Sequence, residues 1–219
     1  MTMHMVLGPP RTGTSLVAGM LHESGIIMGQ NLNPPKEGVN PRGFYEDMNF
    51  VNVHEALLKR INCNWANPPT YQGMTTAVAQ GAQLEIRFLV MMKLEIYGRL
   101  GIEHWGFKDQ RACLLLPLYT SILRGLGCRF IVMHRNPLAT ARSFLRVWPD
   151  LFNSLASALY LIAKYELGIA EFLGGQSEQA IHVSFEQFFE DSEAVTEGLE
   201  QALGLELTRE HLDPTLRHF

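Results

Sequence analysis

The sequence predicts an α/β protein with three layers, in which helices cover both faces of a central parallel sheet. Four short apolar runs predict the strands, and the first stops at Gly8-Pro9-Pro10, as suits a buried parallel strand that is followed by a turn. Helical patterns separate the runs, and strands that alternate with helices form a parallel sheet. The runs are Met3 to Leu7, His104 to Phe107, Arg129 to His134 and Ala180 to Phe185.

The first helix is predicted directly after the first strand. From Thr14 onward apolar residues recur at helical spacing, and Gly25 stands where a helix C-cap is often found. The stretch from Gln30 to Gly43 is rich in Pro, Asn and Gly, a composition that resists both helix and strand. We expect it to be a loop, and such a loop can lie over a site.

A helical insertion is predicted over about residues 50 to 100, between the first and second strands. Apolar spacing indicates one amphipathic helix near Phe50 to Ile61 and, after Pro68-Pro69, a longer one from about Thr76 to Leu100. Further helices are expected after this insertion. They lie near Leu115 to Leu126, Pro137 to Val147, Ser154 to Leu173 and Ser192 to Leu203, the last with Asp191 or Ser192 as its N-cap.

Length and composition indicate a single domain spanning residues 1 to 219. Hydrophobic residues make up 47% of the chain and charged residues 18%, which supplies a sizeable core and excludes disorder as the main state. The 18 basic residues against 22 acidic ones leave a net charge of -4. This balance argues against a protein that coats nucleic acid or anionic membrane, but it permits a local basic site.

Cysteine usage and the start of the chain bear on the compartment. Three cysteines are an odd number without metal-ligand pairing, so we expect reduced thiols rather than a disulfide framework. No apolar run reaches the roughly 18 residues of a membrane span, and the start lacks the basic and long apolar regions of a signal peptide. The expected location is the cytoplasm.

A phosphate-binding turn is predicted between the first strand and the first helix. Its sequence is Gly8-Pro9-Pro10-Arg11-Thr12-Gly13-Thr14-Ser15. In this context a turn points backbone N–H groups, the positive end of the helix dipole and short hydroxyls at one place, and Arg11 adds a bidentate donor. We therefore expect a fold of the P-loop nucleotide-binding type. A turn that merely joined strand to helix would not need this set of residues.

The turn departs from the ATP-binding form at one position. Thr14 stands where an ATP-binding loop has its lysine. The central strand ends in Met133-His134-Arg135, without an aspartate that could hold magnesium. The sequence therefore gives poor support for ordinary hydrolysis of ATP or GTP.

A second anion site is predicted where the third strand ends. Arg135 follows that strand, with Asn136 as the expected N-cap and Pro137 as the first helical residue. Ser143 comes seven residues after Asn136 and so lies on the same helical face. Arg135 and Ser143 could thus face one ligand at the carboxyl edge of the sheet. Taken alone, a solvated arginine and an ordinary helix serine explain the two residues equally well.

Together the two motifs resemble the cofactor motifs of the sulfotransferase family, which uses 3'-phosphoadenosine 5'-phosphosulfate (PAPS) as its donor. The resemblance rests on the turn from Gly8 to Ser15 and on Arg135, Pro137 and Ser143 in the form R-x-P-x-x-x-x-x-S. Supporting fragments look like the order seen in short bacterial-type members and extend over nearly the whole chain. They are Gly43 to Glu46, Trp105 to Arg111, Ser184 to Phe188 and Leu212 to His218.

The resemblance implies two groups of cofactor-binding residues. Arg135 and Ser143 would hold the 3'-phosphate, and the turn would hold the 5'-phosphosulfate. The turn residues are Pro10, Arg11, Thr12, Gly13, Thr14 and Ser15. Arg11 would then take the cationic role that a lysine or arginine has in this family, which explains the absence of the ATP-type lysine.

Three features depart from the family pattern. The chain ends soon after Leu207, without the Gly-rich basic segment that adds 3'-phosphate contacts in larger members, and Arg209 or Arg217 is the replacement to consider. Gln110 stands where many short members have proline and where cytosolic members have a catalytic histidine, so the resemblance does not identify the base. Phe185 stands where a tyrosine is common, near the expected adenine site.

Sulfuryl transfer moves a neutral SO3 unit from a phosphate to an acceptor oxygen or nitrogen. The enzyme must align the two substrates, take the acceptor proton and neutralise the departing phosphate, and no metal is needed for these tasks. Arg11 is the first candidate for neutralising the departing phosphate, and Lys108 is the second. The alternative for Lys108 is a solvated lysine at a strand end.

Glu46 is the leading candidate for the base, because aromatic neighbours would raise a carboxylate pKa. Asp109 is its competitor, and Asp47 and His54 follow. A helix N-cap or first-turn role near Phe50 explains Glu46 and Asp47 equally well.

The expected activity is transfer of a sulfuryl group from PAPS to a hydroxyl or amine of a small molecule, lipid or carbohydrate. Two alternatives stay open: a P-loop small-molecule kinase, which would bind magnesium-ATP, and a non-catalytic nucleotide-binding module. The partners are thus a nucleotide cosubstrate and an unidentified acceptor, and the oligomeric state is open. We expect the acceptor pocket within about Gln30 to Leu100, with Met91, Met92 and Tyr97 in the core.

Overall fold

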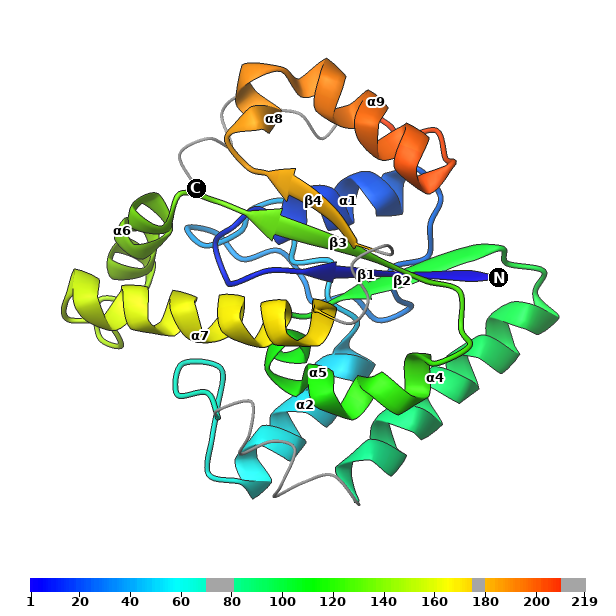
Figure 1. Ribbon diagram of the computed structural model, residues 1–219, viewed down its shortest axis with the longest axis horizontal. Helices are drawn as coiled ribbons and strands as arrows, with labels where there is room; N and C mark the ends of the chain where they lie inside the picture. Colours follow the sequence, from blue (N-terminus) through cyan, green and yellow to red (C-terminus); the bar gives the residue numbers. More distant parts are fainter. Residues whose placement is uncertain (70–80, 175–179, 210–219) are drawn as a thin grey trace.

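A four-stranded parallel sheet forms the centre of the protein (Figure 1). The computed structural model describes residues 1–69, 81–174 and 180–209. Each strand begins and ends within one residue of the predicted run, so the predicted parallel sheet is confirmed. The strands are β1 (Thr2–Leu7), β2 (His104–Lys108), β3 (Cys128–His134) and β4 (Ala180–Ser184), in the spatial order β2-β1-β3-β4.

The strand order brings the predicted motifs to one edge of the sheet. β1 pairs with β2 on one side and with β3 on the other. Val6 pairs with Lys108 of β2, and the next residue, Leu7, pairs with Val132 of β3. Because the carboxyl ends of parallel strands lie at one edge, the turn after β1 is close to both Lys108 and Arg135. The turn lies close to residues of both neighbouring strands because β1 lies between β2 and β3.

Helices cover both faces of the sheet, as the three-layer prediction requires (Figure 1). α1 and α9 pack on one face, whereas α2, α4, α5 and α7 pack on the other. The helices of the described residues are α1 (Thr14–Glu23), α2 (Met48–Arg60), α4 (Ala82–Arg99), α5 (Gln110–Leu123), α6 (Pro137–Val147), α7 (Leu155–Leu173), α8 (Gln187–Glu190) and α9 (Ser192–Leu203).

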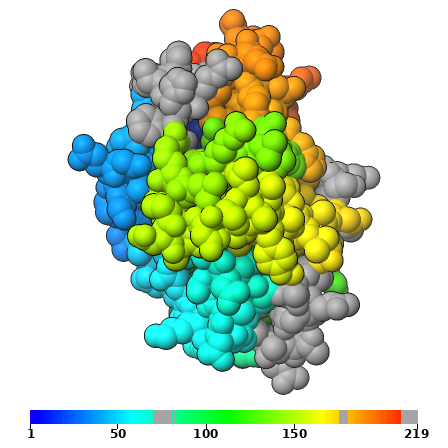
Figure 2. Space-filling model, turned by 90° about the vertical axis from the view of Figure 1, so that its left-hand side faces the viewer, coloured from blue at the N-terminus to red at the C-terminus, as the bar shows by residue number. Residues whose placement is uncertain are grey.

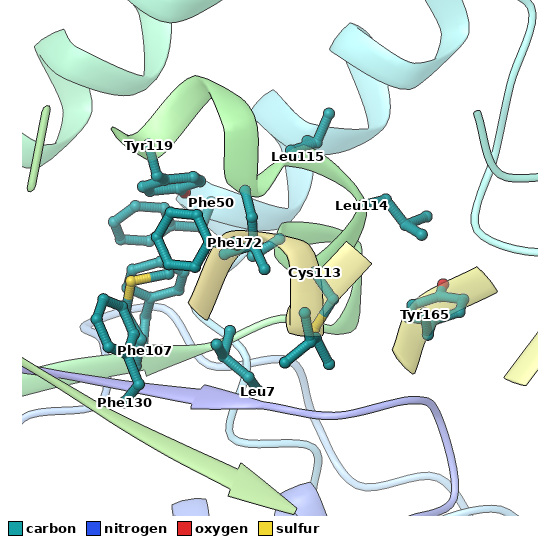
Figure 3. Packing of buried hydrophobic residues seen from close by; sticks show 14 of the residues in the cluster. Leu7, Phe50, Phe107, Cys113, Leu114, Leu115, Tyr119, Phe130, Tyr165 and Phe172 are labelled. Carbon is teal, nitrogen blue, oxygen red and sulfur yellow. The ribbon is translucent and has the colours of Figure 1, made fainter. Parts of the chain in front are cut away.

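Successive residues of a strand point to opposite faces and so contribute to different cores. Met5 of β1 belongs to the larger core, while its neighbour Val6 belongs to the smaller one under α1. In the larger core, Phe50 of α2 stacks on Phe107 of β2 with ring centroids 3.9 Å apart (Figure 3). This contact joins the helical insertion to β2, the strand that ends in Lys108.

Side-chain caps fix where several helices begin. The N-caps of α6, α7 and α9 are Asn136, Ser154 and Asp191. α5 begins at Gln110, earlier than the predicted Leu115, because the Asp109 side chain accepts a hydrogen bond from Arg111 N at 3.0 Å. The short α8 was not predicted. The predicted helix from Thr76 is described from Ala82 onward, as α4, and its start lies outside the described residues.

A buried ion pair fastens the insertion to the loop before α2. Lys93 Nζ of α4 donates to Asp47 Oδ2 at 2.6 Å, and both side chains are at most 2% exposed. Asp47 is also the N-cap of α2, since its Oδ1 accepts a hydrogen bond from Asn49 N at 3.0 Å. The pair therefore holds α4 against the residue at which the Pro- and Asn-rich loop meets α2.

Two expectations about α4 had different outcomes. Tyr97 is buried in the larger core, which confirms its assignment. Met91 is 49% exposed, so its assignment to the core was wrong. Helical spacing alone did not reveal which side of α4 faces the core.

None of the described helices is long and apolar enough to cross a membrane. The three cysteines are free thiols.

Candidate active site

The turn after β1 has the geometry of an anion cradle. Arg11 and Gly13 have positive φ angles of 69° and 92°, which fold the chain back on itself before α1 begins at Thr14. No side chain caps the N-terminus of α1. Among the described residues, no protein acceptor is found for the backbone N–H groups from Arg11 to Ser15. The positive end of the helix dipole and a set of donors therefore face the same space.

Hydrogen bonds within the turn and with α5 hold the turn in place. Thr12 Oγ1 donates to Pro9 O at 2.7 Å, and the buried Cys113 of α5 accepts a hydrogen bond from Gly8 N at 3.4 Å. Cys113 lies beside the end of β1 in the larger core (Figure 3). Burial raises the pKa of the Cys113 thiol to about 12, so this group acts as a neutral support at ordinary pH.

Arg135 lies against the turn from the β3 side. Its guanidinium carbon is 4.2 Å from the centre of the Phe185 ring, and its Nη1 donates to Arg11 O at 2.9 Å. Its Nε is buried and has no hydrogen-bond partner among the described residues. Burial lowers the pKa of Arg135. A buried cationic donor without a partner favours an anion beside it.

Arg11 joins the two predicted motifs. Its Nε donates to Ser143 Oγ at 3.0 Å, and its Nη1 donates to Val39 O at 2.8 Å. Burial, followed by the charges of Arg135 and Arg146, lowers the pKa of Arg11 to about 10. The side chain thus points toward the residues assigned to the 3'-phosphate and toward the loop, while its backbone belongs to the phosphate turn.

The Pro- and Asn-rich loop lies over this site, as expected. Val39, Asn40, Arg42 and Gly43 of the loop line the pocket described below, as do Phe44 and Tyr45, which follow it. Figure 2 looks toward the carboxyl edge of the sheet and shows this loop (lighter blue) beside α6 and α7 (yellow-green), with α8 and α9 (orange) above. Backbone pairing of Leu32 with Asp47 and a bond from Asn33 N to Glu46 O hold the two ends of the loop together.

Lys108 is a buried residue that faces the turn after β1. It is 2% exposed, so the alternative of a solvated lysine was wrong. Its Nζ donates to Glu46 Oε1 at 2.7 Å and to Ser15 Oγ at 3.3 Å. The ring of Phe44 covers it at 6.0 Å. Val6 pairs with it across the sheet, which explains why the end of β2 reaches the turn.

Glu46 and Asp109, the two leading candidates for the base, are both inside the protein. Glu46 is 2% exposed, and its Oε2 accepts a hydrogen bond from Asn33 Nδ2 at 3.1 Å. Asp109 is fully buried; it caps α5 and accepts from Arg111 Nη1 at 2.8 Å and from His54 Nδ1 at 2.7 Å. Neither residue lines the pocket.

The surroundings of Asp109 keep it ionised. Burial alone would raise the pKa of this carboxyl, but the hydrogen bond and charge of His54 and the charge of Arg111 outweigh burial and hold the pKa well below its ordinary value. His54 is itself buried between Asp109 and the Tyr119 hydroxyl, 2.7 Å from its Nε2. Of the two residues considered for a helix cap near Phe50, Asp47 has that role.

A pocket opens at the carboxyl edge between the turn, the loop and the start of α5. Six predicted cofactor residues line it, namely Pro10, Arg11, Gly13, Thr14, Ser15 and Arg135. The other two lie behind these: Thr12 holds the turn, and Ser143 holds Arg11. Lys108 lines the pocket, and Arg11 and Arg135 make its surroundings strongly cationic.

Some pocket residues had no signal in the sequence. Val39, Asn40 and Arg42 lie in a stretch whose composition predicted only a loop, and Trp148 is the residue after α6. The acceptor pocket expected within about Gln30 to Leu100 stays a prediction. Among the described residues of that range, Val39, Asn40, Arg42, Gly43, Phe44 and Tyr45 line the pocket at the turn.

The C-terminal expectations have separate outcomes. Arg209 bonds to Glu200 at 3.4 Å and does not line the pocket. Arg217 and the fragment from Leu212 to His218 lie outside the described residues.

Among the described residues, no group of three or more His, Cys, Asp or Glu side chains is arranged to hold a metal ion.

The protein resembles several solved structures, although sequence comparisons find no match. No protein-family model matches the sequence, and no curated protein matches it. The sulfotransferase domain from the curacin biosynthetic pathway has a TM-score of 0.58 at 17% identity, over 96% of this chain and 76% of that one. The sulfotransferase domain from the Synechococcus PCC 7002 olefin synthase has a TM-score of 0.58 at 19% identity, over 97% and 76%. Sulfotransferase STF9 from Mycobacterium avium has a TM-score of 0.60 at 15% identity, over 97% and 66%.

At these identities the likeness concerns the arrangement of the chain. The superposed regions cover nearly all of this chain. The protein therefore has the fold of the sulfotransferases.

Proposed function

We propose that the protein is a sulfotransferase that takes its sulfuryl group from PAPS. The proposal rests on the observation that two features suited to binding anions lie at one pocket. One is the uncapped N-terminus of α1 with its turn, and the other is Arg135, whose buried Nε has no partner among the described residues. The bond from Arg135 Nη1 to Arg11 O makes the two features neighbours.

The residues present fit a nucleotide with phosphate at both ends of its ribose. Arg135, with Arg11 and Ser143 beside it, would hold the 3'-phosphate, and the N–H groups from Arg11 to Ser15 would hold the 5'-phosphosulfate. The Phe185 ring adds an apolar surface for the adenosine. An ATP-type lysine within the turn is not required for this binding mode, and Thr14 stands in its place.

The bound donor supplies the SO3 unit, and the side chains supply positioning and charge. Lys108 reaches Ser15 from the neighbouring strand, so it is placed to neutralise charge on the phosphate held by the turn. Arg11 adds a positive charge beside the pocket and fastens the loop through Val39. The proposed acceptor is a hydroxyl or amine of a small molecule, lipid or carbohydrate. The proposed location of the reaction is the cytoplasm.

Binding of nucleotides tests the proposal without knowledge of the acceptor. Calorimetry should show that adenosine 3',5'-bisphosphate, the product of PAPS, binds equally well in magnesium and in EDTA. AMP should bind at least about tenfold more weakly, because it lacks the 3'-phosphate that charge-assisted hydrogen bonds would recognise. A preference for magnesium-ATP would contradict the proposal and favour a kinase.

The turn itself gives a second prediction. A Cβ at Gly13 would lie 2.4 Å from Phe185 Cδ2, and the φ of 92° is one that L residues rarely adopt. Gly13→Ala should therefore displace the turn and weaken binding of adenosine 3',5'-bisphosphate about tenfold or more, from the strain and the lost alignment of N–H donors. Gly25→Ala is the control, since it adds a methyl at a φ of 87° with nothing within 4 Å. Equal affinities of the two variants would contradict the prediction.

A further inference from the structure

Glu46 lies behind Lys108 as seen from the pocket. Lys108, Phe44 and Tyr45 line the pocket, but Glu46 does not, although it is the next residue after Tyr45. Its side chain is 2% exposed. A general base must come within hydrogen-bond distance of the proton that it takes, directly or through one water. Lys108, the ion-pair partner of Glu46, lines the pocket, whereas Glu46 does not.

Both carboxylate oxygens of Glu46 already have partners. Oε1 accepts a hydrogen bond from Lys108 Nζ at 2.7 Å, and Oε2 accepts one from Asn33 Nδ2 at 3.1 Å. Arg111 Nη1 lies 3.9 Å from Oε2, and Arg111 is in turn held by Asp109 at 2.8 Å. Each oxygen of this buried carboxylate is thus already hydrogen-bonded within the protein.

The contacts of Lys108 show what this carboxylate does. An ammonium group has three N–H donors. One donates to Glu46 and a second donates to Ser15 Oγ at 3.3 Å. Since Lys108 also lines the pocket, the third is available to a ligand at the phosphate turn. Glu46 thus fixes the ammonium at the end of a long, flexible side chain, which lowers the entropy cost of using it.

We propose that Glu46 is a positioning residue, which holds the Lys108 ammonium against the phosphate turn, and that it does not take the acceptor proton. Asn33 and Arg111 fix the orientation of Glu46, so the chain of contacts runs from Arg111 through Glu46 and Lys108 to Ser15. This role rests on the proposed function, because the ligand that Lys108 meets is the 5'-phosphate of the donor.

Nucleotide binding separates the two roles of Glu46 without an acceptor. Calorimetry with adenosine 3',5'-bisphosphate should be run on wild type, Lys108→Met, Glu46→Leu, Glu46→Gln and the Glu46→Leu/Lys108→Met double variant. Glu46→Leu should weaken binding about tenfold, close to the effect of Lys108→Met, because Lys108 loses its anchor. Glu46→Gln keeps an oxygen that accepts from Lys108 and should stay within about threefold of wild type. The double variant should bind no more weakly than Lys108→Met alone.

A role as the base predicts a different pattern. Both substitutions of Glu46 would then leave nucleotide affinity unchanged, because the base acts on the acceptor. Unchanged affinity in Glu46→Leu overturns the positioning role, as does equal loss in Glu46→Leu and Glu46→Gln, or additive loss in the double variant. Failure of the wild type itself to bind would overturn the proposed function, and with it this inference.

A second buried ion pair supplies the control for folding. Lys93 and Asp47 are as buried as Lys108 and Glu46, but Lys93 does not line the pocket. Lys93→Met should lower the midpoint of thermal unfolding while leaving nucleotide affinity within about twofold of wild type. If Glu46→Leu does not fold, Asn33→Ala replaces it. Asn33→Ala should weaken binding about threefold, and only while Lys108 is present; an effect that persists in Lys108→Met overturns the proposal.

Discussion

Replacement of Arg135 by alanine is expected to weaken binding of adenosine 3',5'-bisphosphate about 100-fold or more, since charge-assisted hydrogen bonds contribute about 1.5 to 3 kcal/mol each and two would be lost. Among the pocket cations, Arg135 has a buried Nε without a partner in the described part of the chain, and its guanidinium lies over the Phe185 ring. Its loss would also free the carbonyl of Arg11, which Arg135 holds at 2.9 Å. Calorimetry of the purified variant measures the effect.

Two further variants identify what Arg135 contributes. Arg135→Lys keeps the charge but loses the planar contact with Phe185 and the forked donors, so its affinity should lie between those of wild type and Arg135→Ala. Arg129→Ala is the matched control, because Arg129 lies on β3, the strand that Arg135 follows, is exposed and does not line the pocket. A similar loss in Arg129→Ala would indicate a general electrostatic effect. An unchanged affinity in Arg135→Ala would remove the assigned 3'-phosphate site.

Replacement of Asp109 by alanine is expected to lower the free energy of unfolding by about 3 to 5 kcal/mol, the usual cost of breaking a buried ionic contact. The change removes the N-cap of α5 and leaves both Arg111 and His54 without their buried acceptor. Urea denaturation followed by circular dichroism measures the loss. Asp191→Ala is the control, since Asp191 caps α9 at the surface and should cost only about 1 kcal/mol. Equal losses would mean that Asp109 acts as a cap and no more.

The pH dependence of this difference has a definite sign. The native pKa of Asp109 is held below its ordinary value of 3.8, chiefly because the contacts with His54 and Arg111 outweigh the effect of burial. The unfolded chain therefore binds a proton at a higher pH than the native protein does. The stability that Asp109 contributes is complete above its ordinary pKa and falls as the pH drops through its native pKa. The difference between wild type and Asp109→Ala should thus shrink below about pH 4.

Local sequence signals accounted for most of the fold. The strands could be located because the apolar runs are only four to six residues long, a length that favours a strand over a helix. The helix starts at Pro137 and Ser192 could be predicted because Asn136 and Asp191 cap their own helices within three residues. The same rule applies to Asp109, but the chemistry expected of its carboxylate concealed its role as the cap of α5.

The candidate site was predicted less completely than the fold. The turn and Arg135 were found because each follows a strand and precedes a helix, and parallel strands bring such positions to one edge. Nothing in the spacing of Arg11 and Val39 indicated that the arginine would reach the loop. Likewise, the exposed side of α4 could not be inferred, because Met91 and Tyr97 both fit a helical apolar pattern.

By itself the sequence determined the elements, the glycine-containing turn after the first strand and the cationic character of one sheet edge, since these depend on residues close together in the chain. Only the tertiary structure decided which charges are paired. Glu46 and Lys108 are 62 residues apart in the sequence, yet their 2.7 Å contact gives the carboxylate its role. The energy of a buried charge depends on its neighbours in space and on its distance from water, and neither is encoded in local spacing.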